Sequence, residues 1–101
     1  MSMTVVVTRN VSARVRGFLA STMLEIAAGV YSAPRISPAV RDRVWRVLED
    51  WFPNEGDASI VMLWQEREMP GGQAVRTLGT PPINLVDVDG LLLARRKPAD
   101  A

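Results

Sequence analysis

Residues 1–17 read MSMTVVVTRNVSARVRG, and this stretch sets how the chain starts to fold. Three consecutive valines at 5–7 are apolar on both faces, as a central strand requires, and they predict a strand over residues 3–9. A short polar turn follows, and Ser12 is a favourable N-cap for a helix. The stretch therefore predicts a buried strand that leads directly into a helix.

The helix after Ser12 is predicted to end near Ala28, with Gly29 as its C-terminal stop. The residues predicted to face the core recur at three- and four-residue spacing and comprise Val15, Phe18, Leu19, Thr22, Met23 and Ile26. Arg14 and Arg16 lie in its first turn and point to different sides. Helix N-termini favour anions and guanidinium groups bind phosphate, so we expect a phosphate site here. The alternative is that both arginines are simply solvated.

The middle of the chain predicts a second helix and a hairpin. Residues 30–32 read as a short strand, and a serine–proline pair opens a helix over 37–52. The expected buried face of that helix comprises Val40, Val44, Val47, Leu48 and Trp51. Apolar strands at 58–65 and 73–78 flank the turn Pro70–Gly72, which predicts a β-hairpin.

The order of these elements predicts an α+β sandwich with two helices on one face of an antiparallel sheet. The ferredoxin-like fold is the commonest such arrangement, but residues 29–37 hold barely one strand, so we expect a modified version. An extra strand is expected at 85–89, followed by a basic tail at 95–98. We therefore divide the chain into a ferredoxin-like core, 1–79, and a C-terminal strand with its tail, 80–101.

The composition narrows the classes of function. The chain has 101 residues, 48% of them hydrophobic, with neither cysteine nor histidine. Thiolate metal sites, thiol nucleophiles and imidazole bases are therefore excluded. No signal peptide or membrane-spanning apolar run is recognisable, so we expect a cytoplasmic protein without a membrane partner. With a net charge of +1, any binding of nucleic acid must depend on local arginines, and eleven of the twelve basic residues are arginine.

Acidic residues form two groups. Asp87-Val88-Asp89-Gly90 begins like a calcium loop, but the third acid and the terminal glutamate of such loops are missing. We expect these acids on the exposed face of a late strand, where they could meet a basic partner, with the neighbouring valines packed inward. The second group surrounds the end of the second helix and comprises Glu49, Asp50, Glu55 and Asp57. Solvation explains that group better than a metal site.

The three tryptophans could serve as stacking surfaces or as core residues. Trp51 and Trp64 fall on apolar-periodic positions, which favours the core. Trp45 is offset from the apolar face of its helix, which favours an interface.

Four segments together resemble CRISPR-associated protein two, in its type I-E variety. They are MSMTVVVTRNV…ARVRG, AAGVYSAP, VMLW near residue 62 and VDVDGLLL near the end. The resemblance covers nearly the whole chain and implies a ferredoxin-like fold, a homodimer and a role in antiviral defence. In type I-E systems the dimer lies between two dimers of the CRISPR integrase. It is a scaffold that holds the double-stranded protospacer DNA during spacer acquisition.

The resemblance also implies roles for individual residues. Arg14 and Arg16 match the family's arginines that clamp the duplex backbone, and Arg9 and Asn10 add a basic and a polar group beside them. Asp89 matches an acid that faces the integrase, and Asp87 belongs to the same docking segment.

One pair of family arginines is missing from this chain. It should follow Gly79, where this chain reads Thr-Pro-Pro-Ile at 80–83. Arg76 or the basic tail at 95–97 would have to compensate.

Other branches of the family are described as metal-dependent nucleases with an aspartate at the end of the first strand. This chain has Thr8-Arg9-Asn10 there, and arginine repels Mg²⁺. We therefore expect no catalytic residue and no cofactor. The alternative is an endonuclease, acting on DNA or RNA, that holds Mg²⁺ with another acid. A further alternative is a small-molecule regulatory module, although no glycine-rich ligand loop supports it.

Overall fold

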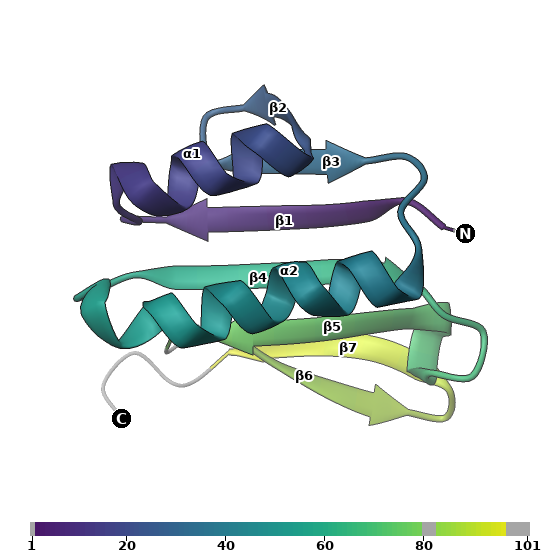
Figure 1. The fold of residues 1–101 in the computed structure, drawn as a ribbon. Coiled ribbons are helices and arrows are strands. Elements are labelled where there is room, and N and C mark those ends of the chain that lie inside the picture. The colour runs from purple at the N-terminus through teal and green to yellow at the C-terminus, as the bar shows by residue number, and fades with distance from the viewer. Residues whose placement is uncertain (1, 80–82, 97–101) are drawn as a thin grey trace.

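The computed structural model describes residues 2–79 and 83–96, and Figure 1 shows its fold. In chain order the elements are β1 (Thr4–Arg9), α1 (Ala13–Thr22), β2 (Leu24–Ala27), β3 (Val30–Ala33), α2 (Pro38–Trp51), the 3₁₀ turn η1 (Phe52–Asn54), β4 (Ser59–Gln65), the 3₁₀ turn η2 (Pro70–Gly72), β5 (Gln73–Leu78), β6 (Ile83–Val88) and β7 (Leu91–Arg96).

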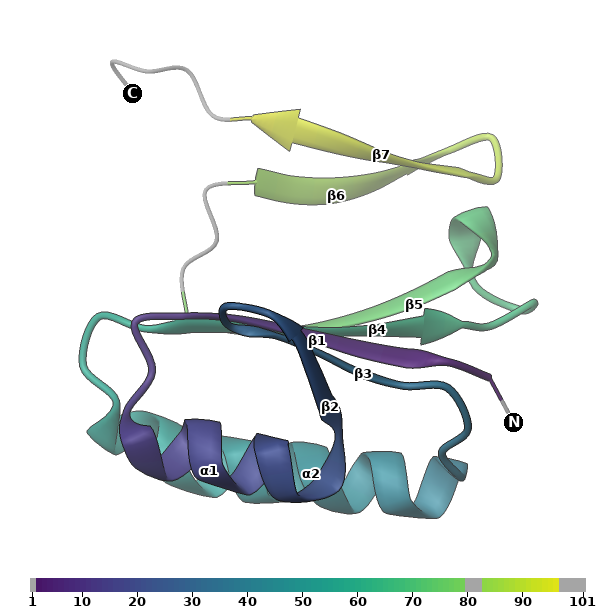
Figure 2. The same ribbon diagram turned by 90° about the horizontal axis from the view of Figure 1, so that it is seen from above.

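The first five strands form one antiparallel sheet in the order β2-β3-β1-β4-β5. The central strand is β1, where Val6 pairs with Tyr31 on one side and Met62 on the other. Figure 2 shows α1 and α2 side by side on one face of this sheet, with the β6–β7 hairpin on the other side. The sequence of elements through β4, and their order in the sheet, confirm the predicted ferredoxin-like α+β architecture.

Helix α1 ends at Thr22, so the prediction that it reaches Ala28 is wrong. The hydroxyls of Ser21 and Thr22 donate to the carbonyls of Phe18 and Leu19, and such bonds weaken helix propagation. Met23 is already extended, with φ −139° and ψ 168°. Because the helix stops early, the next residues have room for β2, the strand that the ferredoxin-like order requires.

The end of the predicted helix instead forms the β2–β3 hairpin. Ile26, expected on the buried stripe, lies on the edge strand and is 58% exposed. Gly29 lies in the hairpin turn with φ +76°, and a Cβ there would come within 2.8 Å of the Thr8 carbonyl oxygen. Glycine is therefore required at this position by the turn and by its contact with β1, not by a helix end.

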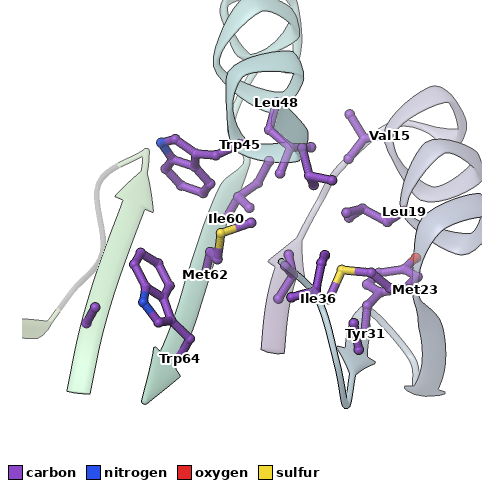
Figure 3. Packing of buried hydrophobic residues seen from close by; sticks show 14 residues of the cluster. Val15, Leu19, Met23, Tyr31, Ile36, Trp45, Leu48, Ile60, Met62 and Trp64 are labelled. Carbon is purple, nitrogen blue, oxygen red and sulfur yellow. The ribbon is translucent and has the colours of Figure 1, made fainter. Parts of the chain in front are cut away.

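The core lies between the helices and the sheet (Figure 3). Its fully buried hydrophobic residues are Val6, Val15, Leu19, Tyr31, Leu48, Ile60 and Met62. Trp64 is buried as predicted. Trp45, predicted to lie at an interface, is also part of the core and is only 7% exposed. Trp51 is half-buried against the cluster, whereas Val40, predicted to be buried, is 39% exposed. Helix α2 is thus rotated so that Trp45 faces the sheet.

The C-terminal region is a two-stranded hairpin, not the single extra strand that was predicted. β6 pairs with β7, and Asp89 and Gly90 turn the chain with φ of 51° and 82°. Two of the predicted tail arginines, Arg95 and Arg96, belong to β7. The predicted linker at 80–82 and the rest of the tail, 97–101, lie outside the described residues.

The hairpin contacts the main sheet at η2. The Gly71 amide donates to the Gly90 carbonyl at 2.8 Å. A Cβ on Gly71, whose φ is +68°, would come within 2.8 Å of Leu92 Cβ. The hairpin therefore meets the body of the protein through a close backbone contact that only glycine permits.

We expect the stability of the fold to fall at alkaline pH because of Tyr31. Burial raises the pKa of Tyr31 above 10.0, and the nearby carboxylate of Glu25 raises it further. The contribution of the neutral phenol is fully present below pH 10 and is lost as pH rises through the folded-state pKa. Urea unfolding at several pH values should show a decline above pH 10 that is reduced in Tyr31→Phe. An equal decline in both proteins would contradict this.

Candidate nucleic-acid interface

The N-terminus of α1 already holds an anion from the protein itself. Ser12 is the N-cap, and its hydroxyl accepts a hydrogen bond from the Val15 amide. Glu55, which follows η1, accepts from the Ser12 amide at 2.6 Å and from the Ser12 hydroxyl at 2.8 Å. This carboxylate offsets the positive end of the helix dipole. A phosphate at this helix end would therefore share the site with the Glu55 carboxylate.

Arg14 leaves the start of α1 on the side that faces α2. Its guanidinium carbon lies 3.8 Å from the centroid of the Trp51 ring. Trp51 in turn packs edge-to-face on Phe18, with 5.3 Å between the ring centroids. Arg14 is exposed, and within residues 2–79 and 83–96 it forms no ion pair. The Arg14 guanidinium therefore lies against the Trp51 ring while its charge remains exposed to solvent.

Arg16 lies on the other side of α1. It lines a pocket of about 480 Å³ together with Asn10, Thr8 and the β2–β3 turn at Gly29. The Thr8 hydroxyl donates to the Gly29 carbonyl at 3.0 Å, which fixes this wall of the pocket. The structure thus brings Arg16 and Asn10 together, and it places Arg14 and Arg16 on different sides of the helix, as the spacing predicts.

Arg9 is not part of this pocket. It ends β1 opposite Ser59, and strand alternation places it on the same face as Val5 and Val7, away from the helices. Asn10 follows with φ +57°, and its side-chain amide donates to the Asp57 backbone carbonyl at 3.3 Å. The four predicted DNA-contacting residues therefore surround the end of β1 without forming one cluster.

Gly17 adds no side chain to the exposed surface of α1 next to Arg16. It is exposed, and a Cβ built on it would meet no atom within 4 Å. Glycine inside a helix is unfavourable compared with alanine, and nothing in the described residues requires it here.

Arg76, expected as one possible replacement for the missing arginine pair, already has an acidic partner. Its guanidinium forms a 2.9 Å ion pair with Asp42 and lies 4.8 Å from the Trp64 ring centroid. Arg41 lies 3.9 Å from the same ring. The contacts among Arg41, Asp42, Trp64 and Arg76 join α2 to β4 and β5, so Arg76 has a structural role. The side chains of Arg95 and Arg96 and the residues after them lie outside the description.

Asp87 and Asp89 occupy the exposed end of the β6–β7 hairpin. Asp87 accepts from the Gly90 amide at 3.0 Å, while Asp89 lies in the turn itself. The expectation that Asp89 lies on a strand face, with Val88 packed inward, is wrong. Asp89 must adopt a positive φ to turn the chain, and Val88 is 46% exposed.

Two residues at this interface were not identified from the sequence as partners of α1. Trp51 was predicted to be a core residue and Glu55 a solvated acid, yet they contact Arg14 and Ser12 respectively. Helical spacing could indicate that Trp51 lies toward α1, but no local pattern signals a contact between residues forty-three apart.

The described residues contain no group of three or more acidic, histidine or cysteine side chains able to hold a metal ion. Within the same part of the chain, neither helix is long and apolar enough to cross a membrane.

A model of a known protein family matches this chain. The family model described as "CRISPR-associated protein (Cas_Cas2CT1978)" matches residues 3–93, which span the main sheet, both helices and most of the β6–β7 hairpin. The match includes the ends of β1 and α1 where Asn10, Arg14 and Arg16 lie. Because it covers nearly the whole chain, this protein belongs to that family of CRISPR-associated proteins.

Proposed function

We propose that this protein is a non-catalytic, dimeric DNA-binding scaffold for spacer acquisition of the type I-E kind. In this role it bridges dimers of the CRISPR integrase and holds the protospacer duplex by its backbone. The observation that carries the proposal is the placement of Arg14 and Arg16. Both are exposed at the start of α1, and neither forms an ion pair within residues 2–79 and 83–96.

Such side chains suit a ligand whose sequence is arbitrary. Contacts to phosphate position a duplex without reading its bases, and their strength depends on counterion release. A twofold dimer doubles each arginine, so two residues per chain become four cationic contacts. A chain with a net charge of only +1 can then bind DNA through local charge.

The face of the sheet opposite the helices supports the dimer. It carries apolar side chains from three adjacent strands: Val5, Val7, Val61, Leu63 and Val75. The register places Leu63 between Val5 and Val75, and Val7 is 39% exposed. The other four are half-buried, and the β6–β7 hairpin lies on this side of the sheet, in contact with η2. Apolar patches of this kind mark protein interfaces, and a second copy of the chain would cover the part that the hairpin leaves accessible.

The β6–β7 hairpin supports docking to another protein. Val88, Leu91 and Leu93 are each about half exposed or more, at 46%, 61% and 46%. Asp87 and Asp89 add negative charge at the same end. This combination fits an apolar partner surface with a basic rim, which is the role proposed for the integrase.

Replacing Arg14 and Arg16 by alanine should weaken binding to duplex DNA and reduce its dependence on salt. Four lost phosphate contacts per dimer should make the negative slope of log K against log salt shallower by about 3 to 4. Fluorescence anisotropy with a labelled duplex of random sequence measures both quantities.

The matched control is Arg35→Ala with Arg67→Ala, which removes the same charge from exposed positions outside this interface. An unchanged slope in the Arg14/Arg16 variant would reject the clamp. Cleavage of DNA or RNA that appears with Mg²⁺ and stops with chelator would favour the nuclease alternative.

A charge on the face of the sheet opposite the helices should separate the dimer. Leu63→Glu places a carboxylate among Val5 and Val75, where a partner would have to desolvate it. Analytical ultracentrifugation should show a monomer, with Ala39→Glu on the exposed side of α2 as the control. A Leu63→Glu protein that remains folded and dimeric would exclude this face as the interface.

Reversing the charge at the hairpin turn should prevent assembly with the integrase. Asp89→Arg keeps an exposed polar residue but opposes a basic partner surface. Co-purification with the cognate integrase should be lost, and DNA binding by the dimer alone should be retained. Full recovery of the complex would remove Asp89 from the docking surface.

A further inference from the structure

Trp51 is placed to do more than fill the core. Its ring is half-buried against the hydrophobic cluster, and Phe18 fixes it from one side at 5.3 Å. The Arg14 guanidinium lies over the ring at 3.8 Å. At this distance the cation lies on the face of the ring, where the aromatic quadrupole attracts it. The indole is therefore a fixed support for an otherwise flexible side chain.

Stacking on an aromatic face leaves the donors of arginine available. The N–H groups of guanidinium lie in its own plane, so a guanidinium that lies flat on a ring keeps all of them available, and the 3.8 Å distance between the guanidinium carbon of Arg14 and the ring centroid of Trp51 fits that arrangement. No carboxylate among the described residues pairs with Arg14, and Glu55, an acid of the α2–β4 connection, is bound to Ser12. The side chain is thus held in place while its hydrogen-bonding edge remains open to a phosphate.

Arg16 provides the contrast. Its pocket neighbours are Thr8, Asn10 and Val11 and the turn at Gly29, and within residues 2–79 and 83–96 no aromatic ring lies against its guanidinium as Trp51 lies against that of Arg14. The two arginines on opposite sides of α1 therefore differ in support: an aromatic ring lies against Arg14, and none of the residues that line the pocket of Arg16 is aromatic.

We infer that Trp51 is a positioning residue that pre-orients Arg14 for a planar, two-pronged contact with a backbone phosphate. The inference rests on the proposed DNA-binding function and adds a residue that does not itself touch DNA. Restraining Arg14 in advance lowers the conformational entropy lost on binding.

The experiment combines substitutions at Trp51 and at each arginine in the full-length chain. Trp51→Leu is measured alone, with Arg14→Ala and with Arg16→Ala, using anisotropy with a labelled duplex at several salt concentrations. Alone, Trp51→Leu should weaken binding about fivefold, which is the size of the cost of ordering one more flexible side chain on binding. With Arg14→Ala it should have no further effect, whereas with Arg16→Ala its full effect should remain. Trp51→Phe, which keeps an aromatic face, should restore most of the affinity.

Charge-preserving variants give an independent measurement if Trp51→Leu fails to fold. Lysine lacks the planar fork, so Arg14→Lys should bind weakly, while Arg16→Lys should bind nearly as well as the natural chain. Equal tolerance of lysine at both positions would overturn the inference.

The remaining outcomes are separable. If Arg14→Ala weakens binding but Trp51→Leu does not, or if the two effects add fully, the positioning role is wrong and the clamp remains. If neither arginine affects DNA binding, the proposed function itself fails.

Discussion

The structure depends on β1 being hydrogen-bonded along both edges. Its pairing with β3 and β4 fixes where the strand ends, and the chain leaves that end through Asn10 in a left-handed conformation. Helix α1 starts three residues later, so the pocket of Arg16 and the support of Arg14 are set by the register of a central strand. The Thr8 amide, bonded to the Gly29 carbonyl at 2.7 Å, ties the β2–β3 turn to the same point. A site at the end of such a strand is held by the most restrained part of the fold.

Much of this arrangement follows from local sequence. The valines of β1, the serine caps at Ser12 and Ser37, and the glycine turn before β5 are each read from a few adjacent residues, and each is confirmed. The predicted separation of Arg14 and Arg16 follows from helical geometry alone. These features were predictable because short-range sterics and hydrogen bonds determine them.

The errors arise where distant residues decide the outcome. An apolar spacing that continues to Ile26 favours a longer helix, but pairing with β3 draws that segment into an edge strand. Trp45 is offset from the apolar face of α2, yet the rotation of that helix buries it against the sheet. In the sequence, nothing distinguishes Glu55 from the acidic residues around it, and only the fold brings it into contact with Ser12. Tertiary contacts override propensity in all three cases.

The distribution of internal contacts explains how a nearly neutral protein can present positive charge. Asp42 is paired with Arg76, and Glu55 keeps its negative charge but is hydrogen-bonded to Ser12 at the start of α1, where it faces the positive end of the helix dipole. Asp87 and Asp89 lie at the turn of the hairpin, which is a separate sheet from the one that carries β1. Arg14 and Arg16 are exposed and form no ion pair within residues 2–79 and 83–96. Because coulombic attraction to a duplex is screened within about 10 Å at moderate salt, the proposed binding to DNA would depend on this local imbalance and not on the net charge.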